Sequence, residues 1–102
     1  MRRGTTPTYT LDLSGVNGGE IIDICLALKQ TKSNTELNLH MSEGRLTIDG
    51  DYAYGTLTQA ETLAFEKGKV KRQVKVKFYG GRVQTTLIDE EDVYDVLHEE
   101  VF

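Results

Sequence analysis

The sequence predicts an α+β fold, in which a mostly antiparallel sheet of five or six strands has two helices packed on one face. Two kinds of periodicity support this class: alternating apolar and polar residues indicate strands, and apolar residues at spacings of three and four indicate helices. Glycine turns between the alternating runs indicate hairpins. The predicted order is strand, helix, hairpin, strand, hairpin, helix. Residues 1–7 are expected to form a flexible tail and residues 8–102 a single α+β domain.

The first strand and the first helix are predicted from adjoining segments. In TYTLDL, residues 8–13, Tyr9, Leu11 and Leu13 alternate with polar residues. Asn17 is a candidate N-cap with an acidic residue, Glu20, three positions later, as in a capping box. A wide apolar arc then predicts a helix from residue 20 to about residue 32, lying against a sheet.

Two hairpins are predicted in the middle of the chain. The first joins residues 35–42 to residues 45–49 through a turn at Glu43 and Gly44, and the second joins residues 70–79 to residues 82–88 through Gly80 and Gly81. Residues 56–67 fit either a strand or a helix that starts at a Thr58–Glu61 capping box, and the pattern slightly favours a strand.

The last helix is predicted over DEEDVYDVLHEEVF, residues 89–102, with acidic residues in its first turn and an apolar stripe of valines and a leucine. Together these elements predict a core made of Leu11, Leu13, Ile21, Cys25, Leu28, Leu37, Leu39, Leu46, Ile48, Val74, Val76 and Leu87.

Composition limits the class of protein. The 102 residues are 38% apolar, which suits one globular domain. No apolar run reaches the length of a membrane span, so no membrane association is expected. The chain has one cysteine, which cannot form an internal disulfide and favours a reducing, cytoplasmic location.

Charge is segregated along the chain. The overall net charge is −4, but residues 66–82 carry seven basic and one acidic side chain, and residues 83–102 carry seven acidic side chains and no Lys or Arg. Such blocks bear on partners rather than on fold. The basic candidates for a binding surface are Lys67, Lys69, Lys71, Lys75, Lys77 and Arg82. The acidic candidates, expected on the exposed face of the last helix, are Asp89, Glu90, Glu91, Asp92, Asp95, Glu99 and Glu100.

Catalytic and metal-binding motifs are weak. Cys25 lies within an apolar run, which favours packing over nucleophilic chemistry. His40 and His98 lack further ligands at metal spacing, and the DGD at 49–51 lacks the remaining positions of a calcium loop. We therefore expect no enzymatic activity, no metal site and no cofactor.

Two functions fit these features. The first is a small non-enzymatic protein-binding module that acts through its charged surfaces, as an inhibitor or regulator of a nucleic-acid-handling or defence protein. The alternative is direct nucleic-acid binding by the lysine ribbon of residues 67–77, although an acidic chain without an aromatic platform argues against it. The ribbon also fits a merely solvated strand face, and the opposite charge blocks also fit a symmetric homodimer.

Overall fold

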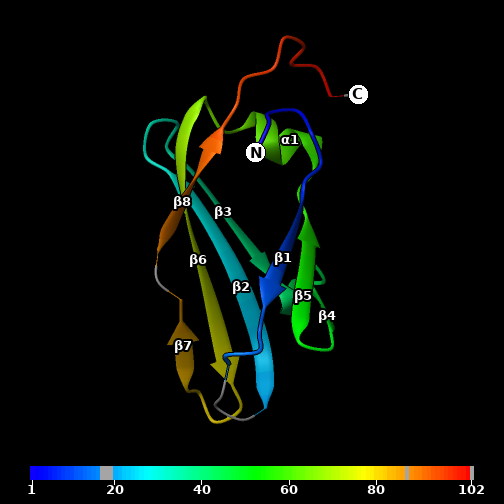
Figure 1. Ribbon diagram of the computed structural model, residues 1–102, viewed down its shortest axis with the longest axis vertical. Coiled ribbons are helices and arrows are strands. Elements are labelled where there is room, and N and C mark those ends of the chain that lie inside the picture. The colour runs from blue at the N-terminus through cyan, green and yellow to red at the C-terminus, as the bar shows by residue number, and fades with distance from the viewer. Residues whose placement is uncertain (17–19, 87, 102) are drawn as a thin grey trace.

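The protein is built from two antiparallel β-sheets that pack on one another, as the computed structural model of residues 1–16, 20–86 and 88–101 shows (Figure 1). The larger sheet has the order β3–β2–β6–β7, and β8 also pairs with β6; the smaller sheet has the order β1–β5–β4. The strands are β1 (Thr8–Asp12), β2 (Ile21–Gln30), β3 (Thr35–His40), β4 (Thr47–Asp49), β5 (Tyr52–Thr56), β6 (Gly68–Phe78), β7 (Val83–Thr85) and β8 (Asp89–Val93).

The predicted α+β class, with two helices covering one face of a sheet, is wrong. Within the described residues the helical elements are the five-residue helix α1 (Gln59–Leu63) and a single 3-10 turn, η1 (Met41–Glu43). The second sheet takes the place that the helices were expected to fill. The protein is therefore a mostly antiparallel β structure with two sheets.

The segment predicted as the first helix is strand β2. Ile24, Leu26 and Leu28 are buried, whereas the residues between them face the other side of the sheet. This period of two is present in the sequence, but it is masked because several of the outward positions are also apolar or small. β-branched isoleucines favour the extended state, and pairing with both β3 and β6 makes β2 a central strand. The Asn17 N-cap lies outside the described residues.

The segment predicted as the last helix begins with strand β8. β8 pairs antiparallel with the first half of β6, in the register Lys69 to Asp92 and Arg72 to Asp89. Opposite charges on neighbouring strands favour this pairing. After Val93, which is buried, Leu97 and Val101 are exposed, so the predicted apolar stripe does not pack on the sheet.

The second of the two predicted hairpins is confirmed, and the first is wrong. β6 and β7 form the second one, and Gly80 and Gly81 have the positive φ values, 98° and 91°, that its turn requires. The first one is wrong because β3 and β4 lie in different sheets. Gly44, with a φ of 76°, ends the 3-10 turn and redirects the chain, and β4 instead forms a hairpin with β5 around Gly50.

Residues 56–67, which fit either a strand or a helix in the sequence, contain helix α1. Thr58 accepts a hydrogen bond from the Glu61 backbone N–H, and the Glu61 side chain accepts one from the Thr58 N–H, so the capping box is formed. Arg45 adds two hydrogen bonds to the same carboxylate, of 2.9 and 2.6 Å. Leu57 before the helix and Phe65 after it are fully buried, which anchors both ends.

The hydrophobic core lies between the two sheets. It consists of Leu13, Ile24, Leu26, Leu28, Leu39, Leu46, Ala53, Leu57, Phe65, Val70, Val76, Phe78 and Val93. Of the predicted core, Leu11, Ile21, Leu37 and Val74 are partly buried against this cluster. Cys25 is half-buried and Ile48 is exposed, so their prediction as core residues is wrong, and Leu87 lies outside the described residues.

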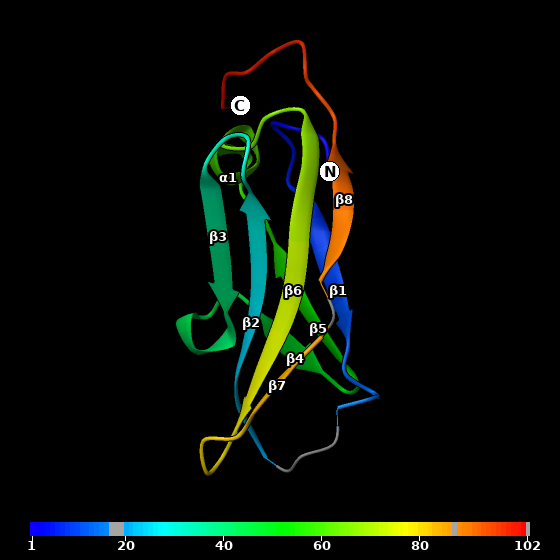
Figure 2. The same ribbon diagram turned by 90° about the vertical axis from the view of Figure 1, so that its left-hand side faces the viewer.

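The N-terminal residues lie beside β8 at the end of the molecule that also carries α1 (Figure 2). Arg2 forms a parallel bridge with Tyr94, and the Arg3 N–H donates a hydrogen bond to the Tyr94 carbonyl. The Arg3 side chain also donates to the Phe65 carbonyl, at 2.6 Å. These bonds fix the segment expected to be a tail along the edge of the larger sheet. No helix in the described part of the chain is long and apolar enough to cross a membrane.

Candidate functional site

The lysine residues of β6 project from the outer face of the larger sheet, away from the smaller sheet. Lys69, Lys71, Lys75 and Lys77 are exposed, whereas Val70, Val76 and Phe78 are buried on the opposite face. β6 is a central strand, so its neighbours hold the lysines in one row. Alternate residues on a strand are about 6.6 Å apart, so the lysines form two pairs at this spacing, separated by Gln73.

A shallow groove of about 530 Å³ runs along this face. β3 and β2 supply one side and β6 and β7 supply the other. Its apolar surface comes from Cys25, Ala27, Val83 and Ile88. The polar and charged side chains around it are Asp23, Lys29, Glu36, Asn38, His40, Lys71, Gln73, Lys75 and Lys77, and Arg72 also borders it. We call this feature the lysine groove.

The positive charge of the row is neutralised at one end only. Lys69 Nζ lies 2.5 Å from Asp92 Oδ1 on β8, and this pairing raises the pKa of Lys69. The other end of β6 pairs with β7, whose three residues are uncharged. Lys71, Lys75 and Lys77 form no ion pair with any residue that the structure describes. Their ammonium groups therefore remain available to a partner.

The opposite side of the groove carries Asp23, Cys25 and His40. Cys25 on β2 is directly across from His40 on β3, and His40 Nδ1 lies 2.9 Å from Asp23 Oδ2. The Cys25 thiol is 4.0 Å from Asn38 Oδ1. On its other flank Cys25 is in register with Lys75 of β6. A thiol, an imidazole and a carboxylate thus share one face of the sheet.

The electrostatic setting of these groups argues against an activated nucleophile. Burial raises the pKa of the Cys25 thiol, Asp23 raises it further, and Lys75 only partly opposes the shift. A cysteine nucleophile needs the reverse, a lowered pKa that gives thiolate at neutral pH. Burial also raises the pKa of Asp23, but hydrogen bonds from Ser42 and His40 outweigh it, so the pKa lies below its usual value and the carboxylate is ionised.

Most of the predicted acidic residues in β8 form ion pairs within the protein. Asp89 receives two hydrogen bonds from Arg72, of 3.0 and 2.9 Å. Glu91 accepts a hydrogen bond from the Tyr9 hydroxyl. The pKa of Tyr9 is raised mainly by burial of the hydroxyl and, to a lesser extent, by this hydrogen bond. Asp92 pairs with Lys69. Of the four acidic residues in β8, Glu90 is the one that forms no ion pair within the described chain.

The remaining predicted acidic residues lie beyond β8. Asp95 and Glu99 both receive hydrogen bonds from Arg3 Nη1, at 2.8 and 2.5 Å, and these bonds raise the pKa of Arg3. Glu100 lies 3.2 Å from His98. The predicted acidic residues therefore do not form one helical face, because Asp89–Asp92 belong to a strand and the other three follow it in an irregular segment.

Three of the predicted basic residues, Lys67, Lys69 and Arg82, lie outside the lysine groove. Lys67 precedes β6, and its carbonyl accepts a hydrogen bond from Lys32 Nζ at 3.1 Å. Arg82 lies in the β6–β7 turn with its guanidinium 5.5 Å from the centre of the Phe78 ring, which belongs to the core side of β6. The groove brings together Lys71, Lys75 and Lys77 and adds Lys29, whereas Lys69 lies in the same row on β6 beyond the groove and pairs with Asp92.

Sequence reasoning missed the β2 and β3 side of the groove. Asp23, Cys25, Ala27 and Lys29 are alternate residues, and reading this segment with a period of two would have placed them on one face. No group of three or more His, Cys, Asp or Glu side chains suited to a metal ion occurs among the residues described. Searches of protein-family models, curated proteins and solved structures gave no match to this chain.

Proposed function

We propose that the protein is a small non-enzymatic binding module that holds an acidic segment of another protein in its lysine groove. The observation that carries this proposal is that Lys71, Lys75 and Lys77 are exposed in one row and lack ion pairs within the described chain. A protein that covers a partner's acidic surface in this way would act as an inhibitor or regulator. The single cysteine is consistent with action in the cytoplasm.

The shape of the groove favours an extended partner segment. Carboxylates on alternate residues of an extended chain are about 6.6 Å apart, which matches Lys75 and Lys77, and carboxylates four residues apart match Lys71 and Lys75 at about 13 Å. The apolar surface around Ala27 and Val83 offers contact area to the residues between them. Exposed charge pairs of this kind contribute mainly to the association rate and to specificity, whereas the apolar contacts slow dissociation.

The same groove is poorly suited to nucleic acid. Asp23 and Glu36 line it, and Glu90 and Asp92 extend from the neighbouring strand β8, so a continuous polyanion would meet carboxylates along its path. None of the described lining residues is Phe, Tyr or Trp, so bases would lack a stacking platform. A protein surface, with charges of both signs, can match this pattern. Direct nucleic-acid binding remains the competing outcome of the test.

The decisive variant replaces Lys71, Lys75 and Lys77 with Glu, which changes the net charge by −6 without altering a core residue. The matched control replaces Lys32, Lys67 and Arg82 with Glu, which changes the charge equally outside the groove. Each protein serves as bait for affinity capture from the organism that encodes it, with and without nuclease, and the captured protein is then purified for binding measurements.

We expect wild type and control to capture the same protein regardless of nuclease, and the groove variant to lose it. With the purified partner, the groove variant should show a lower association rate, and for wild type this rate should fall with salt. Retention that nuclease abolishes, together with direct DNA or RNA binding whose logarithmic affinity falls linearly with the logarithm of salt, would show the nucleic-acid alternative instead. Equal capture by both variants would mean that the lysines are only a solvated strand face.

A further inference from the structure

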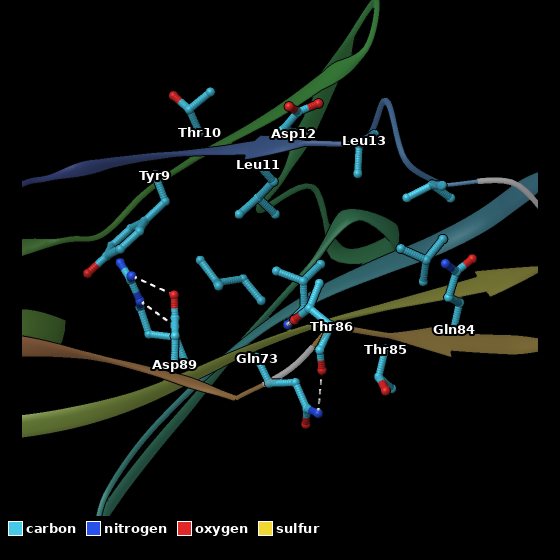
Figure 3. Close-up of a pocket in the computed structure, with 15 residues that line it drawn as sticks. Tyr9, Thr10, Leu11, Asp12, Leu13, Gln73, Gln84, Thr85, Thr86 and Asp89 are labelled. Atoms are coloured by element: carbon cyan, nitrogen blue, oxygen red, sulfur yellow. Dashed lines mark hydrogen bonds and ion pairs between the residues drawn. The ribbon is translucent and has the colours of Figure 1, made fainter.

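A second cleft opens between the two sheets, on the opposite side of β6 from the lysine groove (Figure 3). Its volume is about 300 Å³. β1 of the smaller sheet forms one wall, and β6 and β7 of the larger sheet form the other. Figure 3 shows Tyr9, Leu11 and Leu13 pointing from β1 into this space, whereas Thr10 and Asp12 point away from it.

The interior of the cleft is apolar and its ends are polar. Side chains of Leu11, Leu13, Val16, Leu26, Val74 and Val76 line the interior. At one end lie Tyr9 and the ion pair between Arg72 and Asp89. Asp89 is largely exposed, and Asp12 is a second exposed carboxylate further along β1. The two carboxylates differ in position, because Asp89 is bonded to Arg72 at one end of the cleft and Asp12 lies on the outer face of β1.

The wall formed by β1 is an unpaired strand edge. β1 pairs with β5 alone among the described strands. The Leu13 N–H donates to the Asp51 carbonyl and the Leu57 N–H donates to the Pro7 carbonyl. Hydrogen-bonded pairs alternate in an antiparallel ladder, so residues 7, 9, 11 and 13 bond to β5. The N–H and C=O groups of Thr8, Thr10 and Asp12 therefore point away from β5.

In the facing wall of the cleft, strand β7 also has an unpaired edge among the described strands. The Thr86 N–H donates to the Val74 carbonyl and the Phe78 N–H donates to the Arg82 carbonyl, so the backbone groups of Val83 and Thr85 point away from β6. β7 pairs with β6 alone among the described strands. The cleft lies between two strand edges whose outward backbone donors and acceptors bond to no other strand among the described residues.

Within the described residues, β1 lacks the lysines, bulges or covering segment that usually protect an exposed strand edge, whereas β7 is protected only by its short length of three residues. Charge on β1 is confined to Asp12 at its end, and β7 has none. The β8 edge differs, because it carries four carboxylates and is bonded to residues 1–3. The part of the larger sheet next to the cleft is therefore the part left open.

We propose that this cleft binds an extended peptide segment of a partner protein, which adds to β1 as a further strand of the smaller sheet. Its backbone bonds to the unpaired groups of Thr8, Thr10 and Asp12. Alternate apolar side chains enter the cleft, and the intervening polar side chains face solvent. Basic residues at the ends of the segment are favoured by the exposed carboxylates of Asp12, on the outer face of β1, and of Asp89, which is also bonded to Arg72. This site is separate from the lysine groove and does not depend on the function proposed for it.

The test uses a fluorescein-labelled, terminally blocked heptapeptide, KVTVTVK, and measures fluorescence anisotropy with the full chain. Two peptides of equal length serve as controls: KVVVTTK, which removes the alternation, and DVTVTVD, which reverses the terminal charges. We expect saturable binding of KVTVTVK and at least about tenfold weaker binding of each control peptide. Hydrogen exchange should show that the amides of Thr8, Thr10 and Asp12 become protected when KVTVTVK binds.

Two protein variants test whether the peptide binds at the edge of β1. Thr10→Pro removes an N–H at the edge of β1 that points away from β5, and so breaks no bond to β5; it should therefore weaken binding at least about tenfold with the sheet intact. If this variant does not fold, a peptide with N-methyl groups on alternate residues tests the same bonds with the wild-type protein. The Glu variant of Lys71, Lys75 and Lys77 should bind KVTVTVK as wild type does, because its substitutions lie on the other face of β6.

Several results would overturn the proposal. Absence of binding, equal binding of the three peptides, or binding without protection of the β1 amides would each exclude strand addition at this edge. Sedimentation showing that the protein alone forms a dimer that Thr10→Pro disrupts would assign the edge to a second copy of the chain. Binding of a fatty acid but not of KVTVTVK would assign the cleft to a small apolar ligand.

Discussion

Lys69 Nζ and Asp92 Oδ1 lie 2.5 Å apart across β6 and β8, so the basic and acidic blocks of the sequence meet within one sheet. The register of the two strands also places Arg72 opposite Asp89. β8 therefore pairs with Lys69 and Arg72 in the first half of β6, whereas uncharged β7 flanks the second half. Because no acidic strand of the described chain pairs with the second half of β6, positive charge is in excess around Lys75 and Lys77.

The position of Cys25 in the lysine groove gives a prediction about its reactivity. In the folded protein, iodoacetamide should alkylate Cys25 without prior unfolding, because the thiol is only half-buried. The rate should be lower than for a free-cysteine peptide, since the pKa of Cys25 is raised by burial and by Asp23. Raising a pKa by one unit lowers the thiolate fraction at neutral pH about tenfold. Mass spectrometry over time between pH 7 and pH 9 measures the rate.

Lys75→Glu supplies a sharper form of the same experiment. Lys75 lowers the pKa of Cys25, so this charge reversal should slow alkylation further. Lys67→Glu, which lies outside the groove, is the matched control and should leave the rate unchanged. Alkylation that occurs only in denaturant would contradict the structure and would restore Cys25 to the core position that the sequence suggests.

Gln30 is expected to be important for stability. Its side chain is almost fully buried at the end of β2, where Nε2 donates to the Glu66 carbonyl and Oε1 accepts from the Glu66 N–H, both at 2.7 Å. Gln30→Ala leaves both backbone groups without these partners and should lower the free energy of unfolding by about 1–3 kcal/mol. Urea denaturation measures this change, and Gln73→Ala on the lysine face, where the amide bonds to the Thr86 carbonyl, should cost less. Equal losses would show that the buried position adds nothing.

Part of this structure follows directly from the sequence pattern. The alternation in β1 and β6, the glycine turn between β6 and β7, and the capping box of α1 depend on interactions between residues near one another in the chain. For the same reason, the lysines were expected on one face of β6, and the structure places them there. Local periodicity predicts such features because each is formed within one element or one hairpin.

The errors concern segments whose state depends on distant partners. Residues 21–30 have apolar side chains on both faces, so they satisfy helical spacing as well as alternation, and pairing with β3 and β6 determines the strand. The acidic residues of β8 suit a helix N-terminus, but the lysines and arginine of β6 supply cross-strand partners 17 to 23 positions away. The groove could not be predicted because half of it comes from β2 and β3, one of which was assigned to a helix.

Gly55 on β5 should tolerate no larger residue. A Cβ atom at this position would overlap Leu46 Cδ2 and would lie 3.0 Å from the Arg45 carbonyl oxygen. Leu46 belongs to the core between the sheets, so Gly55→Ala should force a rearrangement that costs about 1–3 kcal/mol of stability. Gly15→Ala is the matched control, because a Cβ atom there has no heavy atom of the described residues within 4 Å outside its chain neighbours. Thermal unfolding of both variants measures the difference, and a neutral Gly55→Ala would show that the sheets pack less closely.

Glu61 should make stability dependent on pH in the acid range. Hydrogen bonds from Arg45 lower the pKa of the Glu61 carboxyl below its ordinary value, and bonds from Thr58 act in the same direction against burial. A carboxyl whose pKa is lowered by folding stabilises the protein fully above its unfolded pKa, and this contribution is lost as pH falls through the folded pKa. Glu61→Gln should therefore cost about 1 kcal/mol at pH 7, where the capping box and the partly exposed pair with Arg45 are weakened. The difference from wild type should shrink as pH falls below about 4.5, the ordinary pKa of a glutamate.

Urea unfolding between pH 3 and pH 7 measures this dependence for wild type, Glu61→Gln and the control Glu66→Gln. Glu66 is exposed, and its recorded bonds involve only backbone atoms, so its variant should follow the wild-type curve. Asp23 and Asp95 also have lowered pKa values, so wild type should lose some stability in acid even after the Glu61 contribution is removed. The diagnostic result is therefore the convergence of the wild-type and Glu61→Gln curves at low pH. Curves that stay parallel would mean that Glu61 stabilises α1 through its shape and hydrogen bonds alone and that its charge has no effect.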